Sequence, residues 1–150
     1  MKNLIQSSII ISLIFSTIFS QQGTKASVKL NDRSVSPMIQ IRYDNFANEN
    51  FTPSSAIGMI LKIDEDRYTG FDVNTSTNET RILMGWKWSI LGISVKEVTL
   101  PDDNTVENVN MYSFGVKYGI LDNMNAVIEY VLSGDSNTDD FLRLTVGVQF

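Results

Sequence analysis

The chain has 150 residues and a formal net charge of −5, and it contains neither cysteine nor histidine. Without cysteine it has no disulfides or thiolate metal sites, and without histidine it has no Ser-His-Asp or Cys-His catalysis and no imidazole-bound metal. The acidic balance does not support nucleic-acid binding, which requires clustered basic surface. We therefore expect one domain that has no cofactor, no metal site and no nucleic-acid partner.

Residues 1–26 are typical of a secretory signal peptide. Lys2 provides a positive start, an apolar stretch of about ten residues follows, and small residues allow cleavage after Ser20 or Ala26. An uncleaved anchor helix is the alternative, but the apolar stretch is shorter than the roughly 20 residues that a spanning helix needs. We expect the mature domain to comprise residues 27–150.

Apolar and polar residues alternate with a period of two through the rest of the chain, which indicates β-strands. One face of each strand is apolar and aromatic, whereas the other carries glycine, serine and charge; Ile128 and Tyr130, for example, oppose Glu129. Several strands have the roughly 9–11 residues that a tilted strand needs to cross a bilayer. About eight strands are expected, at 38–44, 54–63, 66–73, 80–88, 90–98, 109–118, 124–133 and 141–150.

The predicted connections alternate in length. Short links are expected at 64–66, around Ser89 and at 119–123, and longer polar links at 45–53, 74–79, 99–108 and 134–140. Short turns at one rim and longer loops at the other are typical of outer-membrane β-barrels. With about eight strands, both termini lie at the short-turn rim.

Opposite charges are sorted between loops and strands. Nine acidic residues lie in or at the edges of the long links, namely Asp44, Glu49, Glu79, Asp102, Asp103, Glu107, Asp135, Asp139 and Asp140. Cations instead lie on the polar faces of the strands, where a narrow lumen would require them to be paired. We predict a lumen charge network of Arg42, Lys62, Asp72, Arg81, Lys87, Lys96, Lys117, Glu129 and Arg143. Such a network could form an anion-selective passage, but we favour a plug, because an eight-stranded barrel is just wide enough for side chains.

The acidic loops suggest at most a weak contact with divalent cations. Carboxylate oxygens suit Ca²⁺ or Mg²⁺, but the pairs Asp102-Asp103 and Asp139-Asp140 lack the spacing of a defined calcium loop. We favour solvated loops.

Aromatic residues gather near the ends of the predicted strands. Bands of amphipathic aromatics at the two membrane interfaces are typical of outer-membrane barrels. Core aromatics of a soluble sandwich are the alternative. We predict an interfacial girdle of Tyr43, Tyr68, Trp86, Trp88, Tyr112 and Tyr118.

The last predicted strand alternates strictly and ends on an aromatic residue. Its apolar face consists of Leu142, Leu144, Val146, Val148 and Phe150. This pattern resembles the closing strand that the outer-membrane assembly machinery recognises. Together with the signal peptide, strands and links, it is similar to the small eight-stranded OmpA/OmpX-type barrels.

The resemblance implies an all-β, antiparallel, up-and-down transmembrane barrel in the bacterial outer membrane. It implies contact with lipid and lipopolysaccharide, insertion by the assembly machinery, and a structural or adhesive role. We expect a non-enzymatic protein with an envelope-structural, surface-contact or weak solute-passage role. Enzymatic relatives of similar size rely on histidine, so their activity is not carried over.

Two other function classes remain open. A soluble secreted barrel could bind an apolar ligand in a cavity, as lipocalins do. An enzyme could use Glu129 with Asp72, as glycosidases use carboxylate pairs.

Overall fold

The computed structural model describes residues 28–30, 33–47, 52–99 and 105–150. The expected signal peptide, residues 1–26, lies outside this part of the chain. Among the described residues, no helix is long and apolar enough to cross a membrane.

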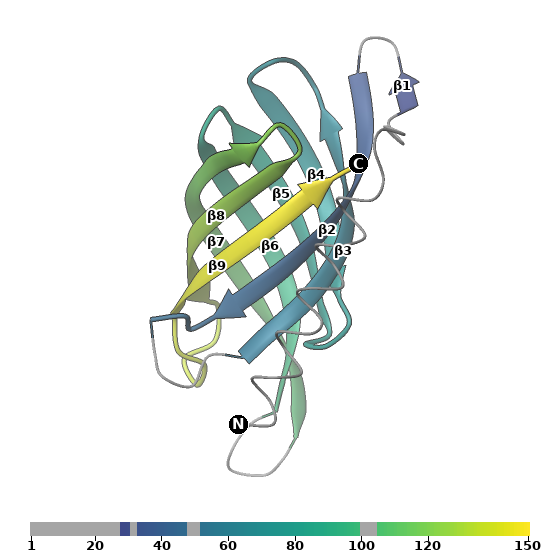
Figure 1. Cartoon of the computed structure of the whole chain (residues 1–150). Helices are drawn as coiled ribbons and strands as arrows, with labels where there is room; N and C mark the ends of the chain where they lie inside the picture. The colour runs from purple at the N-terminus through teal and green to yellow at the C-terminus, as the bar shows by residue number, and fades with distance from the viewer. Residues whose placement is uncertain (1–27, 31–32, 48–51, 100–104) are drawn as a thin grey trace, which may run out of the picture.

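The described residues form an all-β, closed antiparallel barrel (Figure 1). Each strand pairs with the next in sequence, and β2 also pairs with β9, which closes the barrel over eight strands. The strands are β1 (Val28–Leu30), β2 (Arg33–Asp44), β3 (Thr52–Lys62), β4 (Arg67–Asn74), β5 (Glu79–Trp86), β6 (Ser89–Thr99), β7 (Val106–Leu121), β8 (Met124–Ser133) and β9 (Phe141–Gln149). The short strand β1 pairs only with the beginning of β2.

Each strand expected from the alternation corresponds to one barrel strand, because period-two patterning directly reflects the pleat. The sequence did not indicate β1, which has only three residues. Strand β7 has 16 residues and continues to Leu121 through an irregularity near Gly119, so the expected 119–123 link shrinks to residues 122–123.

The connections define two rims (Figure 1). We call the rim with connections 63–66, 87–88 and 122–123 the turn rim, and the opposite rim, with connections 45–51, 75–78, 100–105 and 134–140, the loop rim. One expected long link is in fact a short turn: Asn74 and Glu79 pair within the β4–β5 ladder, which leaves only residues 75–78 between the strands. The C-terminal residue lies at the turn rim, where the Phe150 amide donates to the Pro37 carbonyl at 3.0 Å.

The two faces of the barrel have opposite character. On β5 and β6 the outward side chains of Ile82, Trp86 and Leu91 are 63%, 62% and 56% exposed, whereas inward Leu83 is only 1% exposed. The interior contains charged side chains that are completely buried, including Arg42 and Arg143. The apolar face therefore points outward and the charged face inward, with the strand parity predicted from the sequence.

Two small apolar clusters fill the interior on either side of the charged side chains. The cluster toward the turn rim consists of Met38, Ile60, Tyr68, Leu83, Ile90 and Val127. The cluster toward the loop rim consists of Val109, Met111, Val131 and Phe141.

The Tyr68 ring depends on a glycine on the adjacent strand. Tyr68 pairs with Gly85, and a Cβ atom built on Gly85 would overlap the tyrosine ring. A side chain at this position would therefore displace Tyr68 from the cluster.

We predict that Gly85→Ala lowers the free energy of unfolding by about 1–3 kcal/mol, because it overpacks the interior. Gly119→Ala is the matched control, since a Cβ there would meet nothing within 4 Å. Urea unfolding of both variants in lipid vesicles tests this prediction. Equal stability of the two variants would show that the contact between Gly85 and Tyr68 is unimportant.

Candidate functional site

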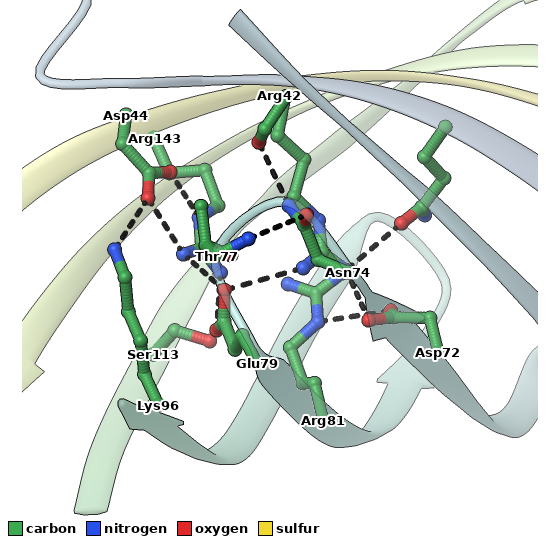
Figure 2. A network of polar contacts seen from close by, with 12 residues as sticks. Arg42, Asp44, Asp72, Asn74, Thr77, Glu79, Arg81, Lys96, Ser113 and Arg143 are labelled. Carbon is green, nitrogen blue, oxygen red and sulfur yellow. Dashed lines mark hydrogen bonds and ion pairs between the residues drawn. The ribbon is translucent and has the colours of Figure 1, made fainter. Parts of the chain in front are cut away.

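Eight charged side chains form a continuous chain across the barrel interior, in which cations and carboxylates alternate (Figure 2). We call this set the ion-pair chain. In order, its members are Glu129, Arg81, Asp72, Arg42, Glu79, Arg143, Asp44 and Lys96. Four positive and four negative groups cancel, so the ion-pair chain is formally neutral.

Arg143 on β9 binds two carboxylates at once. Its Nε and Nη2 atoms donate to the two oxygens of Asp44 at 2.6 and 3.1 Å. Its Nη1 and Nη2 atoms donate to the two oxygens of Glu79 at 2.9 and 2.8 Å. The planar guanidinium suits this double bidentate arrangement, which a lysine ammonium could not reproduce. Lys96 ends the chain by donating to Asp44 at 3.2 Å.

Arg81 on β5 occupies the equivalent position at the other end. Its Nη1 atom donates to both oxygens of Glu129, at 2.9 and 2.7 Å, and its Nε atom donates to Asp72 at 3.1 Å. The Ser113 hydroxyl on β7 adds a hydrogen bond to Glu129 at 2.9 Å.

Arg42 on β2 joins the two halves. It donates to Asp72, to Glu79 at 3.4 Å and to the Gln40 side-chain oxygen at 3.0 Å. With Ser113, the ion-pair chain links every barrel strand except β3. Strand β3 contributes no side chain to the ion-pair chain. Its Gly58 leaves room for the neighbouring strand, because a Cβ there would overlap β4 at Phe71 and Asp72.

Solvent does not reach the middle of the ion-pair chain. Arg42, Asp72, Glu79, Glu129 and Arg143 are 0% exposed. An uncompensated charge at such a depth is strongly destabilising, whereas ion pairs with good geometry offset much of the desolvation cost. The arrangement therefore closes the barrel at this level and holds opposite walls together.

The structure brings together five of the predicted network residues in the buried part of the ion-pair chain: Arg42, Asp72, Arg81, Glu129 and Arg143. Lys96 lies at its end and is partly exposed. Lys62 and Lys117 are separate from the chain and line a polar hollow at the turn rim.

Lys87 lies outside the lumen, which corrects the sequence prediction. It occupies the β5–β6 turn with a positive φ of 54°, and its exposed ammonium lies 3.7 Å from Asp66. The predicted strand included residues 80–88, whereas β5 ends at Trp86. Lys87 therefore lies in the turn and does not take the inward position that the alternation predicts.

The predicted lumen network did not include Asp44 and Glu79, which were expected in or at the edges of the long links. Both are the last strand residues at the loop rim, and their side chains point inward onto Arg143. A signal was available, because Asp44 follows Arg42 by two positions and Glu79 precedes Arg81 by two. Asp44 already ends the predicted strand 38–44, and extending the predicted strand 80–88 back by one residue would have given Glu79 the same face as Arg81.

The structure places three residues of the predicted girdle, Trp86, Trp88 and Tyr118, outside the barrel near the turn rim, where they are 62%, 65% and 74% exposed. Tyr112 also points outward, and Tyr43 is half-buried near the loop rim. Tyr68 does not belong to the girdle. It shares the parity of Asp72 and is therefore buried inside the barrel.

The apolar face of β9 has the outward parity, opposite inward-pointing Arg143 and Thr145. Leu142, Leu144, Val146 and Phe150 are half-buried, and Val148 is buried. Strand β9 closes the barrel against β2. These contacts do not test its predicted role as an assembly signal.

No chemical centre is evident in the part of the chain that the structure describes. No group of three or more acidic side chains there could hold a metal ion. Glu129 and Asp72, the carboxylates considered for acid–base catalysis, are both 0% exposed and bound to Arg81.

No protein-family model and no curated protein matches the chain. Two solved structures of designed proteins are similar. One, from the de novo design of transmembrane β-barrels, is 15% identical with a TM-score of 0.45, and the match covers 77% of this chain and 95% of that one. The other, the solution structure of the designed protein TMB2.3, is 16% identical with a TM-score of 0.44 and coverages of 81% and 98%.

We predict strong coupling between Arg81 and Glu129. Glu129→Met or Arg81→Met alone should lower the free energy of unfolding by about 3–5 kcal/mol, because each leaves a buried charge with too few partners. The double variant should recover much of the lost free energy of unfolding, because Asp72 remains paired with Arg42.

A double-mutant cycle measured by urea unfolding tests this coupling. The exposed pair Lys87 and Asp66 provides the matched control, which should couple by about 0–1 kcal/mol. Additive effects of the two methionine substitutions would contradict the account of the ion-pair chain.

Proposed function

We propose that this protein is an integral β-barrel of the bacterial outer membrane with a non-enzymatic role in envelope structure or surface contact. The observation that carries the proposal is the barrel's inverted polarity: large apolar side chains cover the outside, while ion pairs fill the inside. Closure of the sheet satisfies the backbone of every strand without an edge, which is the condition for strands to cross lipid.

The outer surface is unsuited to water. Ile57, Ile82 and Leu91 lie on different strands and are each more than half exposed, as part of an apolar surface that extends over β3 to β8. Monomeric soluble proteins rarely expose contiguous apolar patches larger than a few hundred Å². The exposed Trp86 and Trp88 beside the turn rim suit the membrane–water interface.

The ion-pair chain argues against solute passage. Six of its eight side chains are at most 1% exposed. Each cation is paired with a carboxylate, so no excess positive charge remains there to select anions. We therefore favour a plugged barrel over the alternative of a weak small-solute channel.

The loop rim is the surface that the proposal assigns to contact outside the cell. Asp140 orders the β8–β9 loop by accepting hydrogen bonds from the Ser133 amide at 2.8 Å and the Tyr130 hydroxyl at 3.2 Å. Exposed Asp139 nearby leaves this rim acidic. Contact with lipopolysaccharide through weakly held divalent cations is consistent with this charge.

The lipocalin-like alternative is disfavoured because it requires the apolar face to line an internal cavity. Here that face points outward. An enzymatic role for Glu129 and Asp72 is disfavoured because both carboxylates are buried on Arg81.

We predict that cell fractionation places the protein in the outer membrane as a band whose gel migration changes on heating. Depletion of the assembly machinery should remove this band, because the proposal makes β9 its recognition signal. Purified barrels in planar lipid bilayers should give no stable conductance steps.

Stable conductance would refute the plugged lumen, and recovery of a monomeric, detergent-independent protein from the soluble fraction would refute the membrane assignment. Arg143→Ala offers a comparison in the bilayer assay, since it removes the guanidinium that binds Asp44 and Glu79.

A further inference from the structure

We propose that the turn rim contains a binding site for a phosphate-type oxyanion, formed by Lys62, Lys117 and Tyr68. These residues belong to three strands and lie beyond the ion-pair chain, toward the turn rim. The proposal adds a ligand site to the barrel and does not depend on whether the protein contacts other cells.

The site is a hollow of about 230 Å³ at the turn rim. Polar groups from β2 and β9 complete its wall, namely Ser34, Ser36 and Gln149. A hollow of this size holds a phosphate group together with water, and the wall offers hydroxyl and amide donors besides the two ammonium groups.

Within the part of the chain that the structure describes, Lys62 and Lys117 form no ion pair with a carboxylate. Lys117 reaches across the interior and lies 3.8 Å from the centre of the Tyr68 ring, while Lys62 is exposed at the end of β3. Both ammonium groups line the same hollow. Two like charges brought together without a counterion favour binding of an anion.

Two of the three carboxylates that line the hollow are paired with other cations. Asp64 binds Arg67 at 2.5 Å, and Asp66 lies 3.7 Å from Lys87. The Arg67 hydrogen bond lowers the pKa of the Asp64 carboxyl below its ordinary value, so Asp64 stays ionised and paired with Arg67. Glu65 is the third carboxylate that lines the hollow. The four cations that line it, Lys62, Arg67, Lys87 and Lys117, exceed the three carboxylates by one.

The Tyr68 hydroxyl provides an independent indication of a ligand. It is buried and has no hydrogen-bond partner among the described residues. The side chain lines the hollow, and the residue is only 9% exposed. A buried donor without an acceptor costs free energy. An oxyanion between the two lysines would accept this hydroxyl proton in a hydrogen bond.

The two lysine ammonium groups indicate a phosphate-type anion, but they do not distinguish between its sources. Lysine ammonium groups bind phosphate as point charges. Inorganic phosphate and the phosphate of a lipid headgroup both supply this chemistry, and Trp86 and Trp88 beside the same rim place the hollow close to headgroups in a membrane. The experiment must therefore distinguish a free anion from a lipid.

The test is calorimetric titration of inorganic phosphate into the full-length barrel in a neutral detergent, with ionic strength kept constant by chloride. We expect saturable binding that weakens about tenfold or more in Lys62→Gln, Lys117→Gln and Tyr68→Phe, as for lost hydrogen bonds to a charged group. Tyr68→Phe keeps the ring beneath Lys117 and removes only the hydroxyl.

Lys96→Gln is the control, because it removes the same charge at the loop rim, away from the residues that line the hollow. It should bind phosphate as the unaltered protein does. Heat-modifiable gel migration checks that each variant is folded.

A second series distinguishes the two sources. Barrels are placed in galactolipid nanodiscs, which lack phosphate, with or without phosphatidylglycerol. Loss of inorganic-phosphate binding when phosphatidylglycerol is present would assign the site to a lipid headgroup, and retained binding would assign it to a free anion. The proposal is overturned if phosphate does not bind beyond the chloride control, or if Lys96→Gln weakens binding as much as Lys62→Gln and Lys117→Gln.

Discussion

The bidentate pairing of Arg143 with Asp44 and Glu79 is the interaction on which the barrel interior depends. It joins β9 to β2 and β5, and thus ties the strand pair that closes the barrel to the opposite wall. Because the guanidinium is completely buried, removal of either carboxylate would leave the set of ion pairs with one uncompensated positive charge. The alternation continues through Arg42 and Arg81, so that one neutral set of ion pairs spans the lumen.

This interior explains the character of the outer surface. Side chains alternate between the two faces of a strand, so a lumen filled with arginine and carboxylate leaves the apolar residues of the same strands outside. An outward apolar face requires apolar surroundings such as lipid. A closed sheet can lie in lipid because it leaves no backbone group unpaired. The polarity of the interior, the closure of β9 onto β2 and the proposed membrane location are therefore linked.

The sequence predicted the strands and their faces because the period of two is a local property. It also predicted the inward positions of Arg42, Arg81 and Arg143. It did not identify Asp44 and Glu79 as partners of the lumen cations because both lie at strand ends beside acidic links, and it misplaced Lys87 because a turn resets the parity. Tyr68 was assigned to the membrane interface from its residue type, although its parity with Asp72 indicated the interior. The partners in the ion-pair chain come from residues up to 99 positions apart, which local pattern alone could not identify.

The polarity of the barrel wall can be measured directly along β8. The chain has no cysteine, so single cysteines carrying spin labels can replace residues 126–132 in turn, in lipid vesicles. We expect the collision rate of the spin label with lipid-soluble oxygen to be high at Ile128, Tyr130 and Leu132 and low at the positions between them. Collisions with a water-soluble nickel chelate should be rare at the outward positions. High collision with the nickel chelate at the outward positions, or oxygen maxima at Val127, Glu129 and Val131, would contradict this expectation.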